Sequence, residues 1–141
     1  MKATLLLRTA SVLALVHGLL HTMGGVFGAP APGAQTVAVT AMQANRFDAM
    51  GVVRSYWDFH MGYGLTLTVK FLLETIIFWQ LASLVKTDAK VKPILLTFGL
   101  GYLAYAALAW RYFFAAPAVF ELVMAVCLLA AWSLTGKSQA A

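Results

Sequence analysis

Four long stretches of the chain consist almost entirely of apolar residues, and polar residues gather in the segments between them. The stretches run from about Thr4 to Phe27, from Tyr56 to Val85, from Ile94 to Phe113 and from Ala118 to Thr135. A helix needs roughly 20 mostly apolar residues to cross about 30 Å of hydrocarbon, so each stretch is long enough, or nearly so, to span a membrane. The pattern therefore predicts four transmembrane helices.

The segments that connect these stretches differ in length. Residues 28–55 form a long connection that opens with G-A-P-A-P-G, whereas residues 87–93 and 115–117 are short. Short connections place consecutive helices antiparallel, and four such helices pack as a bundle. The predicted fold class is an all-α integral membrane protein, with a four-transmembrane-helix bundle as one domain over residues 1–141.

A short helix is predicted inside the long connection, over Val37 to Arg46. The apolar residues Val37, Ala41 and Met42 share one face at helical spacing. A one-sided helix of this length is expected to lie along the membrane surface or to cap the bundle.

Composition agrees with a membrane protein. Only 11% of the residues are charged and 62% are hydrophobic, whereas a soluble domain carries about a quarter charged residues. The single cysteine, Cys127, allows no intrachain disulfide and no thiolate metal site. The net charge of +5 comes mostly from residues at the ends of apolar stretches, which is the pattern of topology signals and not of nucleic-acid binding.

These basic residues also predict an orientation. One side of the membrane would hold Lys2, Arg8, Lys86, Lys90, Lys92 and Lys137, and the other would hold Arg46, Arg54 and Arg111. Because cytoplasmic segments carry the excess of Lys and Arg, both termini are expected in the cytoplasm, with residues 28–55 outside. The alternative is that the first stretch is a signal peptide cleaved near Ala29-Pro30-Ala31.

The second stretch opens with a helix-start motif. Ser55-Tyr56-Trp57-Asp58 has the S-x-x-D spacing of a capping box, in which the serine oxygen accepts a free backbone N–H and the acid lies in the first turn, where the helix dipole favours it. Arg54 lies four residues before Asp58 and offers a local ion pair. Structural roles are therefore predicted for Arg54, Ser55 and Asp58.

A polar stripe follows along the same helix, made of Tyr63, Thr66, Lys70 and Glu74. At 100° per residue these four lie within about 80° of one another. A charged side chain in mid-membrane costs about 2.5–3.5 kcal/mol on insertion scales, and pairing Lys70 with Glu74 at i,i+4 offsets only part of that cost. The stripe is therefore predicted to face the bundle interior or a wet cavity.

Other helices offer polar side chains at matching depths. His17 and His21 share a helix face at i,i+4, Tyr102 reaches a similar level, and Glu121 lies about one turn inside the outer boundary. Each of these residues also has a simpler alternative role. Each histidine could serve only as a hydrogen-bonding group. Arg111 could form a salt bridge with Glu121 across the A-A-P turn, and a structural role is therefore predicted for Arg111.

Together these residues predict an intramembrane polar pocket, lined by His17, His21, Tyr63, Thr66, Lys70, Glu74, Tyr102 and Glu121. The leading interpretation is the binding of a small amphipathic or hydrophobic ligand. A membrane enzyme that uses His/Glu acid–base chemistry on a lipid-like substrate is one alternative, and a metal-binding or proton-coupled carrier subunit is another. No cofactor or metal ion is predicted, because H-x-x-x-H lacks the glutamate of H-E-x-x-H, and no catalytic residue is assigned. The expected partners are the lipid bilayer and such a ligand, and the pattern is compatible with a homo-oligomer.

Several short motifs also resemble those of a small family of bacterial four-helix inner-membrane proteins. They are G-L-L-H-T-M-G-G (18–25), R-F-D-A-M-G (46–51), R-S-Y-W-D-F-H-M-G-Y-G (54–64) and W-R-Y-F-F-A-A-P (110–117). The resemblance covers nearly the whole chain and implies a bacterial inner-membrane location and a four-helix fold, with the activity left open. Because the family usually carries an aromatic residue at the position of His60, the resemblance argues against His60 as an essential ligand.

Overall fold

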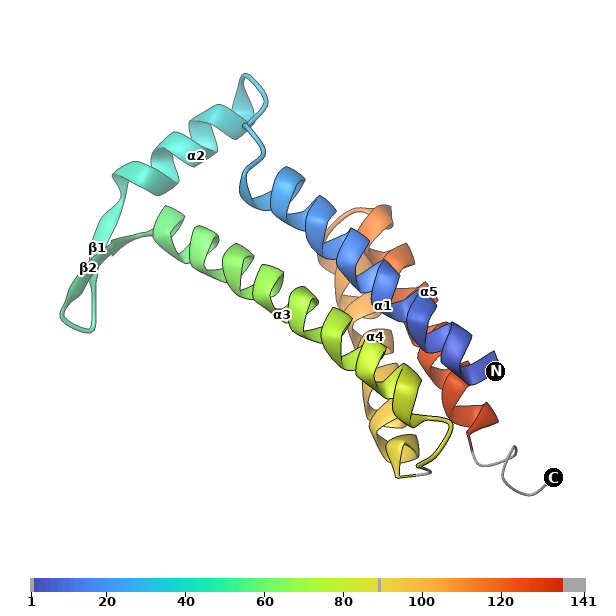
Figure 1. Ribbon diagram of the computed structural model, residues 1–141. Coiled ribbons are helices and arrows are strands. Elements are labelled where there is room, and N and C mark those ends of the chain that lie inside the picture. Colours follow the sequence, from blue (N-terminus) through green and yellow to red (C-terminus); the bar gives the residue numbers. More distant parts are fainter. Residues whose placement is uncertain (1, 89, 136–141) are drawn as a thin grey trace. The chain divides into compact units, whose positions relative to one another are not determined.

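The computed structural model describes residues 2–88 and 90–135, which form helices and one β-hairpin (Figure 1). The elements are α1 (Lys2–Leu20), the π-helix η1 (His21–Val26), α2 (Ala34–Ala44), β1 (Arg46–Ala49), β2 (Val52–Ser55), α3 (Tyr56–Leu84), α4 (Val91–Tyr112) and α5 (Ala115–Leu134). Lys137, one of the basic residues used to predict the orientation, lies outside the described residues.

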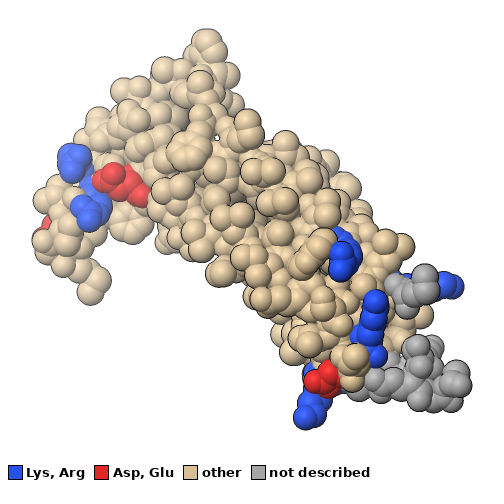
Figure 2. Space-filling view, viewed as in Figure 1, with Lys and Arg blue, Asp and Glu red and all other residues tan. Residues whose placement is uncertain are grey.

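Four helical segments among the described residues are long and apolar enough to cross a membrane. They are Lys2–Val26, Tyr56–Leu84, Val91–Tyr112 and Ala115–Leu134. The four predicted spans are confirmed in this sense, and the chain has the character of a multi-pass membrane protein. Figure 2 shows the same distribution on one face: the helical surface is almost entirely uncharged, and the charged side chains gather near turns and helix ends.

Two of the helices begin three residues before the predicted start. α4 begins at Val91 and includes Pro93, and α5 begins at Ala115 and includes Pro117. A proline in the first turn loses no hydrogen bond, because the first N–H groups of a helix have no partner inside the helix. The sequence prediction treated both prolines as parts of the connecting turns, which is why it started these helices too late.

The first span changes its winding near its end. α1 passes into η1, where the N–H of Phe27 bonds to the carbonyl of Thr22, five residues back. Gly24 and Gly25 lie in this segment, and glycine weakens a regular α-helix by about 1 kcal/mol relative to alanine. The wider turn starts at His21, which is one of the predicted site residues.

The long connection contains the predicted short helix and, in addition, a hairpin that the sequence analysis did not predict. The helix is α2, whose residues are mostly exposed, and its position on a membrane surface stays a prediction. Strands β1 and β2 pair antiparallel with Arg46 opposite Ser55 and Ala49 opposite Val52. Met50 (φ 57°) and Gly51 (φ 88°) form the two-residue turn, and a type I′ hairpin turn requires positive φ at both of these positions.

The hairpin is anchored to the start of α3 by aromatic contacts. The ring of Phe47 in β1 lies 4.9 Å from that of Tyr56 and 5.7 Å from that of Phe59, measured between centroids. Strand β2 ends at Ser55, directly before α3. These contacts fix the chain direction at the point where the second span begins.

The contacts divide the chain into two compact units. The first combines the chain up to His17 with the chain from Phe71 onward, and the second covers Gly18–Lys70. The first unit has a continuous apolar core to which all four spanning helices contribute, with fully buried residues that include Leu7, Ala10, Ala14, Phe78, Ala82, Leu95, Tyr102, Met124, Ala125, Leu128 and Ala131. α4 and α5 pack closely there: a Cβ added to Gly99 would lie 2.6 Å from Cδ2 of Leu129.

Candidate functional site

Two buried polar contacts lie inside the core of the first unit. The first joins α1 to α5: Nδ1 of His17 lies 3.6 Å from Oε1 of Glu121, and both residues are buried. The imidazole of His17 is also in contact with the rings of Phe71 (4.4 Å between centroids) and Phe120 (4.9 Å). An apolar surrounding of this kind strengthens an electrostatic contact, because no water competes for either group.

The second contact joins α3 to α4. The hydroxyl of Tyr102 donates a hydrogen bond of 2.6 Å to Oε2 of Glu74. Tyr102 is fully buried and Glu74 is 6% exposed. A bond this short, made by a hydroxyl to a carboxylate, belongs to the stronger class of hydrogen bonds. Each of the four spanning helices thus supplies at least one polar side chain to the interior of this unit.

We call His17, Glu74, Tyr102 and Glu121 the carboxylate cluster. Its four side chains belong to the buried part of the first unit. The ring of Phe78 and that of Tyr105 flank Tyr102, at 5.9 Å each between centroids. Chemically, the cluster combines an imidazole, a phenol and two carboxylates, which are the groups that accept and donate protons in acid–base catalysis and in proton relays.

A pocket lies within the second unit, against the first turns of α3. It has a volume of about 320 Å³, and its lining residues are Arg54, Asp58, Phe59, Gly62, Tyr63 and Thr66. Five of these residues, at sequence positions 58, 59, 62, 63 and 66, belong to α3. Residues spaced by three or four positions lie on the same face of a helix, so these five share one face. We call this cavity the α3 pocket. Its volume is at the lower end of the range for small-molecule sites, which is about 300–1,000 Å³.

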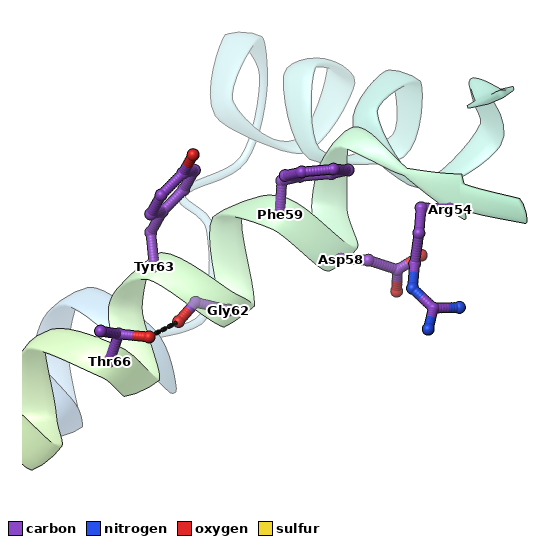
Figure 3. Close-up of a pocket in the computed structure, with 6 residues that line it drawn as sticks. All are labelled: Arg54, Asp58, Phe59, Gly62, Tyr63 and Thr66. Carbon is purple, nitrogen blue, oxygen red and sulfur yellow. Dashed lines mark hydrogen bonds between the residues drawn. The ribbon is translucent and has the colours of Figure 1, made fainter. Parts of the chain in front are cut away.

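One end of the α3 pocket is charged, and a capping box fixes it in place. The N–H of Ser55 bonds to Oδ2 of Asp58 at 2.7 Å, and the N–H of Asp58 bonds to Oγ of Ser55 at 3.1 Å. These are the two reciprocal hydrogen bonds that the S-x-x-D spacing indicates. Figure 3 shows the side chains of Arg54 and Asp58 next to each other at this end of the helix.

The rest of the α3 pocket is mainly apolar. Phe59 and Tyr63 place their rings on the same side of α3, and Gly62 leaves the backbone between them uncovered (Figure 3). A Cβ added to Gly62 would meet no atom within 4 Å. The hydroxyl of Thr66 donates to the carbonyl of Gly62 at 2.8 Å, so its methyl group and the lone pairs of its oxygen remain available to the surroundings.

His21 and Lys70 lie elsewhere in the second unit. Nε2 of His21 donates to the carbonyl oxygen of Gly64 at 3.0 Å, which ties η1 to α3. Beside it, the hydroxyls of Thr22 and Thr68 are 2.9 Å apart. Lys70 is half-buried. The contact of His21 matches the plain hydrogen-bonding role that the sequence left open for each histidine.

Six of the eight predicted pocket residues are therefore found in one of two settings, and His21 and Lys70 are in neither. His17, Glu74, Tyr102 and Glu121 form the carboxylate cluster of the first unit, and Tyr63 and Thr66 line the α3 pocket of the second. The predicted polar stripe is not uniform: Tyr63 is 70% exposed, whereas Glu74 is 6% exposed. The stripe is thus buried at its Glu74 end and open at its Tyr63 end.

The alternative role predicted for Arg111 is a salt bridge with Glu121. Among the described residues, the carboxylate of Glu121 lies 3.6 Å from the imidazole of His17, and the guanidinium of Arg111 lies over the ring of Tyr112 at 5.3 Å. His60, for its part, stacks on Trp57 with 5.0 Å between ring centroids, and the part of the chain that the structure describes contains no group of three His, Cys, Asp or Glu placed to hold a metal ion.

Three residues that matter for these sites were not predicted. Phe71 and Phe120 enclose His17, and Phe59 forms a wall of the α3 pocket. Helical spacing gave a usable signal for Phe71, which lies three residues before Glu74 and one turn away on the same helix. Comparisons with protein-family models, with curated proteins and with solved structures gave no match for this chain.

Proposed function

We propose that this chain is a multi-pass membrane protein that binds a small amphipathic ligand in the α3 pocket. The observation that carries the proposal is the division of one pocket into a charged end, at Arg54 and Asp58, and an apolar wall, at Phe59 and Tyr63. A molecule with a polar head and an aliphatic tail matches both parts. A few fixed polar groups beside apolar and aromatic side chains are also the usual make-up of small-molecule sites.

The position of the pocket in the chain supports the same ligand class. It lies at the first turns of a 29-residue helix, and such a helix is about 44 Å long, longer than the hydrocarbon layer of about 30 Å. The charged end of the pocket therefore falls in the headgroup region and its apolar wall falls deeper. An amphipathic molecule in a bilayer is oriented in the same way, so it would enter the pocket without turning over.

A second function is favoured by the carboxylate cluster: proton transfer, either in acid–base catalysis on a lipid-like substrate or in a proton-coupled carrier. Ionisable groups inside transmembrane segments are costly, and they commonly mark proton relays or substrate paths. The supporting observations are the 3.6 Å approach of His17 to Glu121 and the 2.6 Å hydrogen bond from Tyr102 to Glu74.

The setting of both functions follows from the basic residues and the family resemblance. We place the protein in a bacterial inner membrane, as a relative of the four-helix family that its motifs resemble. Both termini lie in the cytoplasm, because the positive-inside rule puts the richer set of Lys and Arg there. Residues 28–55, with α2 along the membrane surface, then lie on the outer side, and a homo-oligomer is compatible with this arrangement.

The ligand-binding proposal is tested by photo-crosslinking in reconstituted vesicles. An aliphatic amphiphile that carries a diazirine in its tail is added and irradiated, and the labelled peptides are mapped by mass spectrometry. Labelling concentrated between residues 59 and 66, and suppressed by an excess of the unlabelled amphiphile, supports the proposal. Labelling spread over the lipid-facing sides of all four spans, without competition, overturns it.

Two glycine substitutions supply the matched control. Gly62→Leu places a side chain in the α3 pocket, and Gly101→Leu places the same side chain on α4; an added Cβ meets no atom within 4 Å at either glycine. We expect competed labelling to fall at least tenfold in Gly62→Leu and to stay unchanged in Gly101→Leu.

A further inference from the structure

The guanidinium of Arg54 has hydrogen-bonding capacity that the protein does not use. Of the five N–H donors of an arginine, one, on Nη1, bonds to the carbonyl of Val53 at 3.2 Å, and this is the hydrogen bond that Arg54 makes to the described part of the chain. Arg54 is exposed and lines the α3 pocket. Its other donors therefore point to water or to a bound molecule.

The neighbouring acid is already occupied. Oδ2 of Asp58 accepts the N–H of Ser55, so the carboxylate is held by the helix cap. Arg46 and Arg54 both lie close enough to Asp58 to interact electrostatically with it. Of these two arginines, Arg54 is the one that lines the pocket.

Asp48, the acidic residue of the hairpin, also accepts a backbone hydrogen bond. Oδ1 of Asp48 accepts the N–H of Gly51 at 2.6 Å, at the two-residue turn. Both acids keep their negative charge, but the group at the mouth of the α3 pocket with unused hydrogen-bond donors is the planar guanidinium of Arg54. A guanidinium binds a carboxylate or phosphate through two parallel hydrogen bonds.

We infer that the α3 pocket selects an amphiphile with an anionic head, a carboxylate or a phosphate, which binds Arg54 while the tail lies along Phe59 and Tyr63. This inference rests on the proposed ligand-binding function and adds the charge of the ligand to it. Arg46 contributes attraction without a required contact. Asp58 holds the helix start in place through the capping box.

The experiment compares three amphiphiles that share a dodecyl chain and differ in the head: dodecyl phosphate, dodecyltrimethylammonium and dodecyl maltoside. Each competes with the photoactivatable probe against the full-length protein in vesicles of phosphatidylcholine. Inorganic phosphate serves as a fourth competitor, to separate binding of a lipid-like molecule from binding of a free anion. The variants are Arg54→Gln, in β2, and as a control Arg111→Gln, in α4.

We expect dodecyl phosphate to compete at a concentration at least tenfold lower than either of the other amphiphiles. Arg54→Gln removes this advantage and leaves competition by dodecyl maltoside unchanged, and Arg111→Gln changes neither. The advantage also shrinks as salt is raised, because exposed charges are screened.

Three outcomes overturn the inference: equal competition by all three dodecyl compounds, an advantage that survives Arg54→Gln, or competition by inorganic phosphate at the same concentration as dodecyl phosphate. The first two leave the proposed function standing, with a site that ignores the charge of the head. Failure of every amphiphile to compete removes the proposed function itself, so the two failures are distinguishable.

Discussion

Tyr102 and Glu74, 28 positions apart in the sequence, meet in a buried hydrogen bond of 2.6 Å between the phenol and the carboxylate. α3 supplies the acid and α4 supplies the donor. A carboxylate buried among apolar side chains is costly unless it is hydrogen-bonded. The contact therefore explains how an apolar bundle accommodates Glu74, and it makes the two helices depend on each other.

Tyr102→Phe is expected to lower the free energy of unfolding by about 1–3 kcal/mol, because it removes a hydrogen bond from a buried acceptor. The measurement is unfolding in mixed micelles with increasing denaturing detergent. Tyr112→Phe is the matched control, since Tyr112 is 70% exposed, and its effect should stay within about 0.5 kcal/mol. Equal stability of wild type and Tyr102→Phe would show that the hydrogen bond is not formed in the membrane.

The contact between His17 and Glu121 should appear as an energetic coupling. In a double-mutant cycle with His17→Asn and Glu121→Gln, we measure the change in the free energy of unfolding for each variant. We expect the change in the double variant to differ from the sum of the two single changes by about 0.5–3 kcal/mol. The control cycle pairs Glu121→Gln with Arg111→Gln, whose guanidinium lies over Tyr112, and should be additive within about 0.5 kcal/mol. Coupling between Glu121 and Arg111, together with no coupling between Glu121 and His17, would instead show that Glu121 interacts with Arg111.

Gly99 and Gly101 lie two residues apart on α4 and should respond differently to the same substitution. A Cβ at Gly99 would lie 2.6 Å from Cδ2 of Leu129, whereas one at Gly101 would meet no atom within 4 Å. Gly99→Ala is expected to destabilise the protein by about 1–3 kcal/mol, through overpacking. Gly101→Ala should be neutral, and Leu129→Ala should restore space for the methyl group at position 99. Equal effects at both glycines would place the α4–α5 packing elsewhere.

The capping box at the start of α3 should behave as one unit. Ser55→Ala and Asp58→Ala are each expected to cost about 1 kcal/mol, and the double variant should cost less than their sum, because the two hydrogen bonds are reciprocal. Ser83→Ala, at an exposed position of the same helix, is the control and should have little effect. The readout is amide hydrogen exchange of residues 55–60, and a purely additive result would mean that the two bonds act independently.

The spans could be predicted from the sequence because length and hydropathy decide whether a helix can cross a membrane. The hairpin could not be predicted as readily, because each strand has only four residues and short apolar runs do not distinguish strand from helix. The available signal was Gly51 between Ala49 and Val52, at a position where the turn needs positive φ.

The candidate site was predicted only in part. The cost of a mid-membrane charge indicated that Glu74 would be buried, and matching depths brought Tyr102 and Glu121 into consideration. The same reasoning placed Tyr63 and Thr66 inside, although both are exposed. Helical periodicity gives the direction in which a side chain points from its own helix. It does not give the neighbouring helix, if any, that packs against this face at each position along the helix axis.

Native mass spectrometry of the protein, extracted gently from its own membrane, tests most directly whether the α3 pocket holds an amphipathic molecule. We predict that the wild-type protein and Gly101→Leu both retain a small amphipathic species that dissociates on activation, and that Gly62→Leu loses it. A wild-type protein that carries no such species, or a species retained equally by Gly62→Leu, would contradict the assignment of this pocket as a ligand site.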